Sequence, residues 1–147
     1  MDLVIAGLGR MRANMARRLH HARHHVVAYN RSAEKVRDIR AEGLDGAFTP
    51  AEAVAKLPTP RIVWLMLPAG DATEAAMEEF AGLLSKGDTL IDGGNANFKA
   101  SKRRHALRAE RGVHFVDAGI SGVVWGLENG YGTMVGGDRE AVEPLEP

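Results

Sequence analysis

Several residue types and patterns are missing from this 147-residue sequence, and each absence excludes a class of protein. It has no cysteine, which excludes disulfides, thiolate zinc sites and cysteine nucleophiles. Basic and acidic residues both number 19, so the net charge is zero. This balance does not indicate the basic face that a nucleic-acid-binding protein requires. No apolar run approaches a membrane span and no signal-peptide pattern opens the chain, so we expect a cytoplasmic protein without membrane or nucleic-acid partners.

The sequence does contain a regular alternation of short apolar runs and longer amphipathic segments. The apolar runs predict strands at 3–7, 25–30, 61–67, 89–94 and 113–119. The amphipathic segments predict helices at 10–19, 32–42, 50–57, 71–84 and 99–111, with Ser32 and Asp71 as caps. This order is typical of a Rossmann-type α/β domain, a doubly wound and mostly parallel sheet with helices on both faces, and we expect it to occupy 1–147. From Ile120 to the end the sequence reads as a glycine-rich tail.

A glycine-rich turn, GLGRMR, lies between the first predicted strand and the first helix. Gly7 permits a tight turn, and Gly9 leaves room for a phosphate to approach the backbone. In such a turn the backbone N–H groups and the positive helix end face a pyrophosphate. The position predicts a dinucleotide site whose pyrophosphate is lined by Gly7, Leu8, Gly9, Arg10, Met11 and Arg12.

Arg12 replaces the third glycine of this motif, and three interpretations are open. It could be an ordinary exposed helix residue, it could reach a phosphate as a positive charge, or its bulk could push the helix off the sheet. We favour damage to the site over a gain, since overpacking costs roughly 1–3 kcal/mol and would weaken cofactor binding.

The second predicted strand ends in Tyr29-Asn30-Arg31-Ser32, about 20 positions past the turn, where this fold meets the adenosine ribose. No carboxylate stands there to accept from the free 2′-hydroxyl of NAD. Arg31 could pair with a 2′-phosphate, with Asn30 and Ser32 as hydrogen-bond donors. The segment favours NADP over NAD, the alternative being that Arg31 is merely solvated at a helix start.

Five motifs occur in one order: GLGRMRANMARRL, YNRS, WLMLPAG, LIDGGN and SGVVWGLENGYGTMVGG. Together they resemble the N-terminal coenzyme-binding domain of 6-phosphogluconate dehydrogenase, especially its shorter bacterial type. IDGGN followed by SGxxWGLENGY is far more specific than the glycine turn. A fragment of a 3-hydroxyisobutyrate-type β-hydroxyacid dehydrogenase is an alternative, although that group is less similar in the later motifs.

The resemblance implies the oxidative decarboxylation of 6-phosphogluconate to ribulose 5-phosphate, a step of the pentose phosphate pathway, with NADP or NAD. It implies a pyrophosphate contact for Gly7 to Arg12 and a 2′-phosphate contact for Asn30, Arg31 and Ser32. It places Leu67, Pro68 and Ala69 near the nicotinamide ribose. It assigns contacts with both coenzyme and substrate to Asn95, and substrate contacts to Ser121, Gly122 and Val123. Of these, Asn95 and Ser121 are the candidate catalytic residues.

Three positions depart from the glycine that is usual in this family. Besides Arg12, they are Arg23 at the end of the first helix and Val123 in the substrate loop. An arginine in the left-handed position after a helix costs about 1 kcal/mol, and a β-branched residue at 123 fills space beside the substrate. All three changes work against function.

The family also has a helical C-terminal domain, which supplies a catalytic lysine as base and a glutamate as acid. The present sequence stops before that region, and Lys99 and Lys102 are interpreted as solvated surface. We therefore expect an NADP-binding domain that does not complete the reaction alone. The alternatives are half of a split enzyme completed by a separate helical chain, and a non-catalytic remnant.

Four histidines near the end of the first helix include pairs at a spacing of four, which can bind a metal on one helix face. They are His20, His21, His24 and His25. Because the helix is expected to end near Arg23, we interpret them as exposed side chains and predict no metal site.

Overall fold

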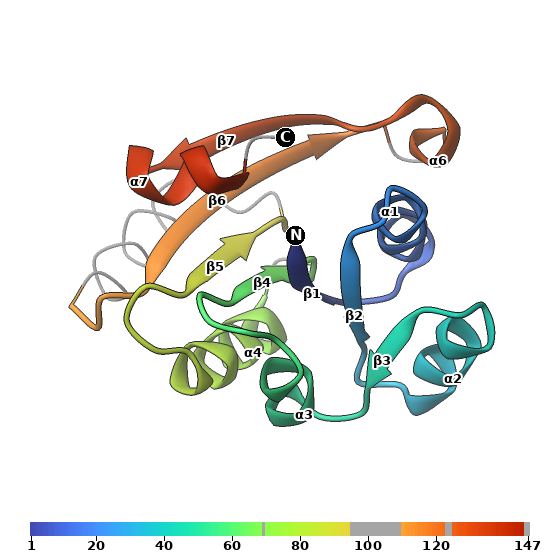
Figure 1. Cartoon of the computed structure of the whole chain (residues 1–147), viewed down its shortest axis with the longest axis horizontal. Helices are drawn as coiled ribbons and strands as arrows, with labels where there is room; N and C mark the ends of the chain where they lie inside the picture. The colour runs from blue at the N-terminus through green and yellow to red at the C-terminus, as the bar shows by residue number, and fades with distance from the viewer. Residues whose placement is uncertain (69, 95–109, 123–124, 146–147) are drawn as a thin grey trace.

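The computed structural model describes residues 1–68, 70–94, 110–122 and 125–145. Their strands form one seven-stranded sheet in the order β3-β2-β1-β4-β5-β6-β7 (Figure 1). The strands are β1 (Asp2–Ala6), β2 (His25–Tyr29), β3 (Asp45–Ala47), β4 (Ile62–Leu65), β5 (Thr89–Asp92), β6 (His114–Ser121) and β7 (Gly132–Gly137). Strands β1 to β6 are parallel and β7 is antiparallel to β6, so the predicted Rossmann-type fold is confirmed.

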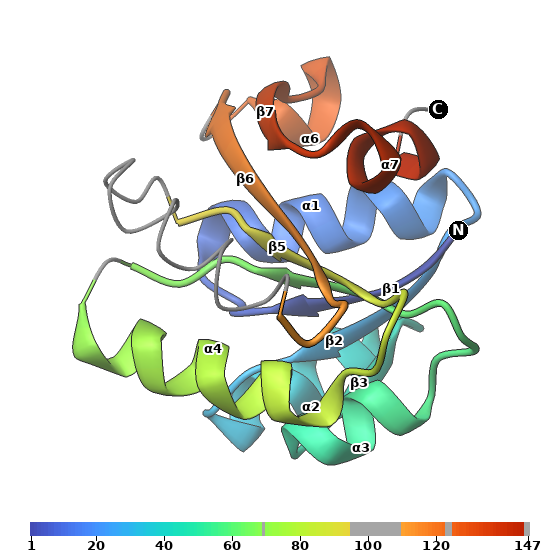
Figure 2. The ribbon, with the colours of Figure 1, turned by 90° about the vertical axis from the view of Figure 1, so that its left-hand side faces the viewer.

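Helices connect the strands and cover both faces of the sheet (Figure 2). They are α1 (Arg10–His21), α2 (Ala33–Ala41), α3 (Pro50–Ala55), α4 (Asp71–Leu83), α6 (Gly126–Asn129), α7 (Arg139–Val142) and the 3-10 turn η1 (Glu143–Leu145). Most of the predicted helix over 99–111 lies outside the described residues. The presumed glycine-rich tail after Ile120 contains α6, β7, α7 and η1, so its interpretation as a tail is wrong.

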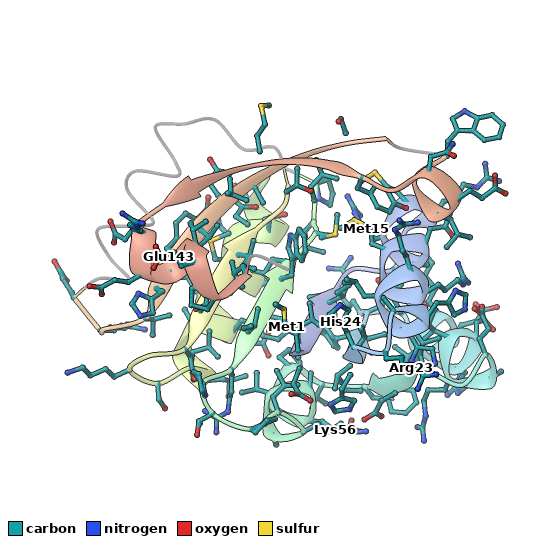
Figure 3. The ribbon with its side chains drawn as sticks, turned by 45° about the horizontal axis from the view of Figure 1, so that its top comes forward. Met1, Met15, Arg23, His24, Lys56 and Glu143 are labelled. Atoms are coloured by element: carbon teal, nitrogen blue, oxygen red, sulfur yellow. The ribbon has the colours of Figure 1, made fainter. Side chains whose placement is uncertain are left out.

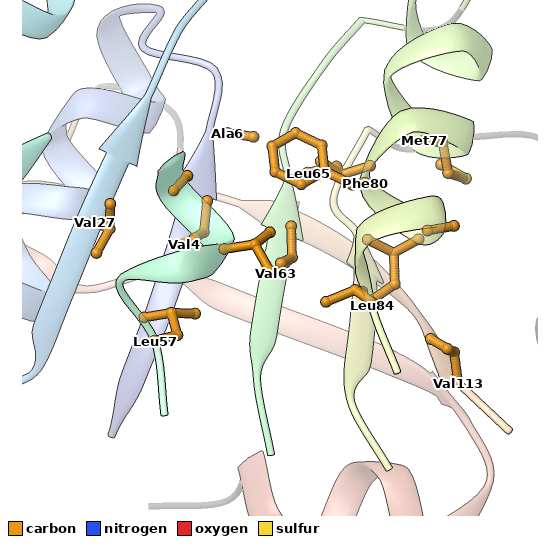
Figure 4. Packing of buried hydrophobic residues seen from close by; sticks show 14 of the residues in the cluster. Val4, Ala6, Val27, Leu57, Val63, Leu65, Met77, Phe80, Leu84 and Val113 are labelled. Carbon is orange, nitrogen blue, oxygen red and sulfur yellow. The ribbon is translucent and has the colours of Figure 1, made fainter. Parts of the chain in front are cut away.

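The core explains why the strands read as continuous apolar runs. On one face, Val63 and Leu65 of β4 pack with Met77 and Phe80 of α4, and all four are fully buried (Figure 4). On the other face, the strands pack against α1 and α2. A strand covered on both faces needs apolar side chains at every position.

The end of α1 has the backbone that the sequence predicts. Arg23 has a φ of 67° and follows the cap residue Ala22. The N–H of His24 donates to the carbonyl of Leu19 at 3.0 Å, and that of Arg23 donates to the carbonyl of His20 at 2.9 Å. These two bonds form a Schellman motif, in which the left-handed residue is usually glycine.

Of the two residues predicted as helix caps, one occupies the cap position and the other does not. Ser32 is the cap residue of α2, but its side chain makes no capping hydrogen bond. The prediction for Asp71 is wrong, because Gly70 is the cap residue and Asp71 begins α4. There its carboxylate lies in the first turn, where the partial positive charge of the helix N-terminus stabilises a negative side chain. Among the described residues, no helix has both the length and the apolar character needed to cross a bilayer.

Candidate functional site

The carboxyl ends of the parallel strands meet at one edge of the sheet. In register, Ala6 at the end of β1 pairs with Tyr29 of β2 and with Leu65 of β4, which in turn pairs with Asp92 of β5. The turns that follow these strands therefore lie side by side. The strand order reverses between β1 and β4, and open α/β sheets bind ligands in the crevice at that point.

Gly7 makes the turn after β1 possible. Its φ is 104°, and a Cβ placed there would lie 2.5 Å from the carbonyl oxygen of Met66, so only glycine fits. Its N–H donates to the carbonyl of Tyr29 at 2.8 Å. This turn packs closely against the end of β4, so the chain enters α1 directly at this edge of the sheet.

The first turn of α1 presents unsatisfied donors. Gly9 is its cap residue in extended conformation, with no side-chain capping bond, and the first turn carries no acidic residue. The first N–H groups of a helix have no acceptor within the helix. This end of α1 can therefore accept an anion, and a phosphate group is the ligand that such helix ends commonly bind.

Arg12 turns back over this end of the helix. A Cβ built on Gly9 would lie 3.4 Å from Arg12 Nη1. The side chain is half-buried, and burial lowers the pKa of its guanidinium. Meanwhile α1 keeps Ala13, Met15 and Ala16 buried against the sheet. The expectation that Arg12 displaces the helix is therefore wrong, since helical side chains point toward the N-terminus and this one leaves the helix–sheet contact.

Asn30 joins the turn after β2 to the glycine turn. Its Oδ1 accepts a hydrogen bond from the backbone N–H of Leu8 at 3.0 Å, and its Nδ2 lies 3.5 Å from the carbonyl oxygen of Ser32. The sequence predicted a ligand contact for Asn30 but not this link between two turns. Arg31 and Ser32 are exposed beside it, and no carboxylate stands at the end of β2.

The segments after β4 and β5 form the next part of this edge. Leu67 is half-buried and Pro68 is exposed, and Thr73 Oγ1 donates to the carbonyl of Pro68. Asp92 is 1% exposed and its Oδ1 accepts from the N–H of Gly94 at 2.9 Å, a role that the sequence analysis missed. The predicted site residues Ala69, Asn95 and Val123 lie outside the described residues.

The candidate substrate residues Ser121 and Gly122 lie at the carboxyl end of β6. Both are exposed, and the Ser121 hydroxyl donates to the carbonyl of Gly132 on β7 at 3.4 Å. This weak bond leaves the hydroxyl able to contact a ligand.

The motif WGLENGY ties this end of β6 to the glycine turn. Tyr131 Oη donates to the carbonyl of Met11 in the first turn of α1 at 3.3 Å, and burial raises the pKa of Tyr131. Arg18 Nη1 donates to the carbonyl of Leu127 at 2.8 Å. Gly126 is necessary because a Cβ there would overlap the Tyr131 ring. The two halves of the candidate site are thus joined through α1.

An apolar cavity of about 510 Å³ lies between α1, the sheet and the segment β7 to η1. Its lining includes Leu19, Trp64, Val135 and Leu145. Outside it, Trp125 and Met134 are 71% and 81% exposed. Met134 alternates along β7 with Thr133 and Val135, which line the cavity, so its side chain points away from the cavity.

The four histidines near the end of α1 do not converge. His24 Nδ1 lies 3.3 Å from the amino group of Met1 (Figure 3), whereas His25 Nδ1 lies 3.0 Å from Asp2 Oδ1. Within the part of the chain that the structure describes, no group of three or more His, Cys, Asp or Glu residues is placed to hold a metal ion.

Comparison with known proteins places the chain among dehydrogenases. The family model "NAD binding domain of 6-phosphogluconate dehydrogenase" matches residues 2–147. The YqeC protein of Bacillus subtilis (strain 168) is 39% identical over 147 residues, which cover 100% of this chain and 49% of YqeC. The NAD(+)-dependent, decarboxylating 6-phosphogluconate dehydrogenase of Haloferax volcanii is 38% identical over 147 residues, which cover 100% of this chain and 48% of that enzyme.

Solved structures agree with these sequence matches. Plasmodium falciparum 6-phosphogluconate dehydrogenase, determined in its apo form and in complex with NADP+ and with 6-phosphogluconate, matches with a TM-score of 0.91 and 30% identity. That match covers 99% of this chain and 32% of the P. falciparum chain. A 3-hydroxyisobutyrate dehydrogenase is also among the similar structures. The chain therefore spans about a third to a half of the length of these proteins.

Proposed function

The chain belongs to the family of the NAD-binding domain of 6-phosphogluconate dehydrogenase, and on this premise we propose that it binds NADP(H) at the turn between β1 and α1. The observation that carries the proposal is the edge of the sheet where Gly7, the uncapped start of α1 and Asn30 meet. The N-terminus of α1 would hold the diphosphate of the coenzyme. When bound, the nicotinamide would accept a hydride from the substrate.

The preference for NADP rests on the end of β2. Arg31 and Ser32 are exposed there, and no carboxylate is present to repel a 2′-phosphate. Arginine suits a phosphate because its planar guanidinium can donate two parallel hydrogen bonds. The P. falciparum enzyme has been determined with NADP+, whereas the H. volcanii enzyme is NAD(+)-dependent, so relatives of both kinds exist.

We further propose 6-phosphogluconate, or a related phosphorylated sugar acid, as the substrate. Ser121 and Gly122 would contact its carboxylate and hydroxyl groups, together with Asn95 and the segment around Val123. The lysine base and glutamate acid implied by the family resemblance are not assigned to any of the 147 residues. A positioned base or acid contributes typically about 10²–10⁴-fold to such a step, so we expect the 147 residues alone to be inactive.

A complementary helical domain is the partner that this chain's surface favours. The apolar cavity beside β7 and the exposed side chains of Trp125 and Met134 leave apolar surface uncovered around this strand, and such surface marks interaction sites. A helical domain, on the same or a separate polypeptide, would cover this surface and complete the substrate site.

Titration calorimetry of the 147-residue chain tests this proposal. We expect micromolar binding of NADPH, weaker binding of NADH, and no steady formation of NADPH from NADP+ and 6-phosphogluconate. Failure of both coenzymes to bind would favour the non-catalytic remnant. Steady turnover by this chain alone would show that the catalytic groups are already present.

A further inference from the structure

We propose that Arg12 is a coenzyme-binding residue of this chain, whose guanidinium pairs with the diphosphate at a position that is usually glycine in the family. This inference rests on the proposed function and adds a cation to the same site. It replaces the expectation that Arg12 only damages the turn.

The geometry places the guanidinium at the right position. Gly9 is the residue of the turn whose missing side chain lets a diphosphate approach the backbone. Arg12 Nη1 lies 3.4 Å from the place where a Gly9 Cβ would be. The cation therefore lies directly beside the space that a diphosphate would enter, in the first turn of α1.

Of the other three arginines of α1, Arg10 is exposed to solvent, and the remaining two have hydrogen-bond partners. Arg17 Nη2 donates to Glu42 Oε1 at 2.6 Å, and Arg18 Nη1 donates to the carbonyl of Leu127 at 2.8 Å. Among the residues that the structure describes, none accepts a hydrogen bond from the Arg12 guanidinium or forms an ion pair with it. Arg12 is half-buried all the same, so part of its hydration is lost without replacement.

The positive charges around Arg12 favour the binding of an anion. The first turn of α1 contains no acidic residue, and the start of a helix carries a partial positive charge of its own. A cation at this position is repelled by the helix unless a negative group lies between them. A diphosphate held by the N–H groups of the same turn would pair with both the Arg12 guanidinium and the start of the helix. It would do so through charge-assisted hydrogen bonds, which are stronger than neutral ones.

The same geometry admits one competing role, in which the guanidinium closes the turn and hinders the coenzyme. The two roles predict opposite effects of removing the charge. Arg12→Gln keeps most of the side-chain length and removes the charge, and Arg12→Lys keeps the charge. Arg111→Gln removes one exposed charge from the turn before β6, at the opposite end of the strands, and is the matched control.

The test compares NADPH with adenosine 2′-monophosphate, which carries the 2′-phosphate but no diphosphate. We expect Arg12→Gln to weaken NADPH binding by roughly 10- to 100-fold, the range for a hydrogen bond to a charged group. Affinity for adenosine 2′-monophosphate should stay unchanged, as should NADPH affinity in Arg111→Gln. Arg12→Lys should retain part of the affinity, and the fall of NADPH affinity with added salt should be shallower in Arg12→Gln.

Three results would overturn the inference. Equal or tighter NADPH binding by Arg12→Gln would assign Arg12 the closing role. Equal losses for both ligands would show general damage to the site, which circular dichroism would trace to folding. Failure of the unsubstituted chain to bind either coenzyme would instead overturn the proposed function, and this inference with it.

Discussion

At the scale of single residues, Asn30 is the clearest case of a side chain with two tasks. Its Oδ1 fixes the Leu8 N–H, which leaves Nδ2 as the group that could donate to a 2′-phosphate. Asn30→Asp keeps the acceptor but replaces that donor with a negative oxygen. We expect roughly a 10- to 100-fold loss of NADPH affinity, because like charges a few ångströms apart repel strongly. NADH affinity, measured by the same calorimetry, should change little.

Asn30→Ala is the control for this prediction. It removes both groups and leaves the Leu8 N–H without its acceptor, which costs about 1–3 kcal/mol where water cannot replace it. Both coenzymes should then bind more weakly, NADPH by the larger factor because it also loses the Nδ2 donor. A parallel loss of both coenzymes in Asn30→Asp would show that the residue only supports the glycine turn.

At the scale of elements, the end of α1 offers a stability test that does not involve the site. Arg23 holds a left-handed conformation at the centre of the Schellman motif. Arg23→Gly should raise the free energy of unfolding by about 1 kcal/mol, because glycine adopts this conformation without steric cost. Urea denaturation measures the change, and Arg23→Ala is the control, since alanine keeps the Cβ and should give little gain. Equal stability of all three would contradict the prediction.

The elements also show what the sequence could and could not predict. Strands β1, β2, β4 and β5 were predicted because buried parallel strands are apolar throughout. Strand β7 was missed, since its glycine-rich sequence GTMVGG is exposed at every position and carries no hydrophobic pattern. Strand β3 has only three residues, which is too short for a periodicity to appear.

The candidate site likewise contains features that a local sequence pattern predicts and features that it does not. The glycine turn was recognisable because its residues are consecutive, as was the left-handed Arg23. The bond between Asn30 and Leu8 joins residues 22 positions apart, and that between Tyr131 and Met11 joins residues 120 apart. Such contacts depend on strand order and register, which a local pattern does not contain. The direction of the Arg12 side chain likewise follows from helix geometry, whereas its size alone suggested that it would displace α1 from the sheet.

At the scale of the whole molecule, the proposed coenzyme site exists only when the sheet is assembled, because its turns follow β1, β2, β4 and β5. A ligand that binds only the folded chain stabilises it by mass action. At an NADPH concentration 100 times its Kd, the free energy of unfolding should rise by about 2.7 kcal/mol. For a chain of this length the Tm should then rise by roughly 5–10 °C.

Scanning calorimetry with increasing NADPH measures this shift, and Arg12→Gln at the same concentrations should show a smaller one. Arg111→Gln should follow the unsubstituted chain, since its charge lies at the other end of the strands. An unchanged Tm at saturating NADPH would mean that the coenzyme does not distinguish the folded from the unfolded chain. In that case the turn between β1 and α1 would keep the shape of a dinucleotide site without its binding energy, and the charge of Arg12 would have to be explained by a different anion.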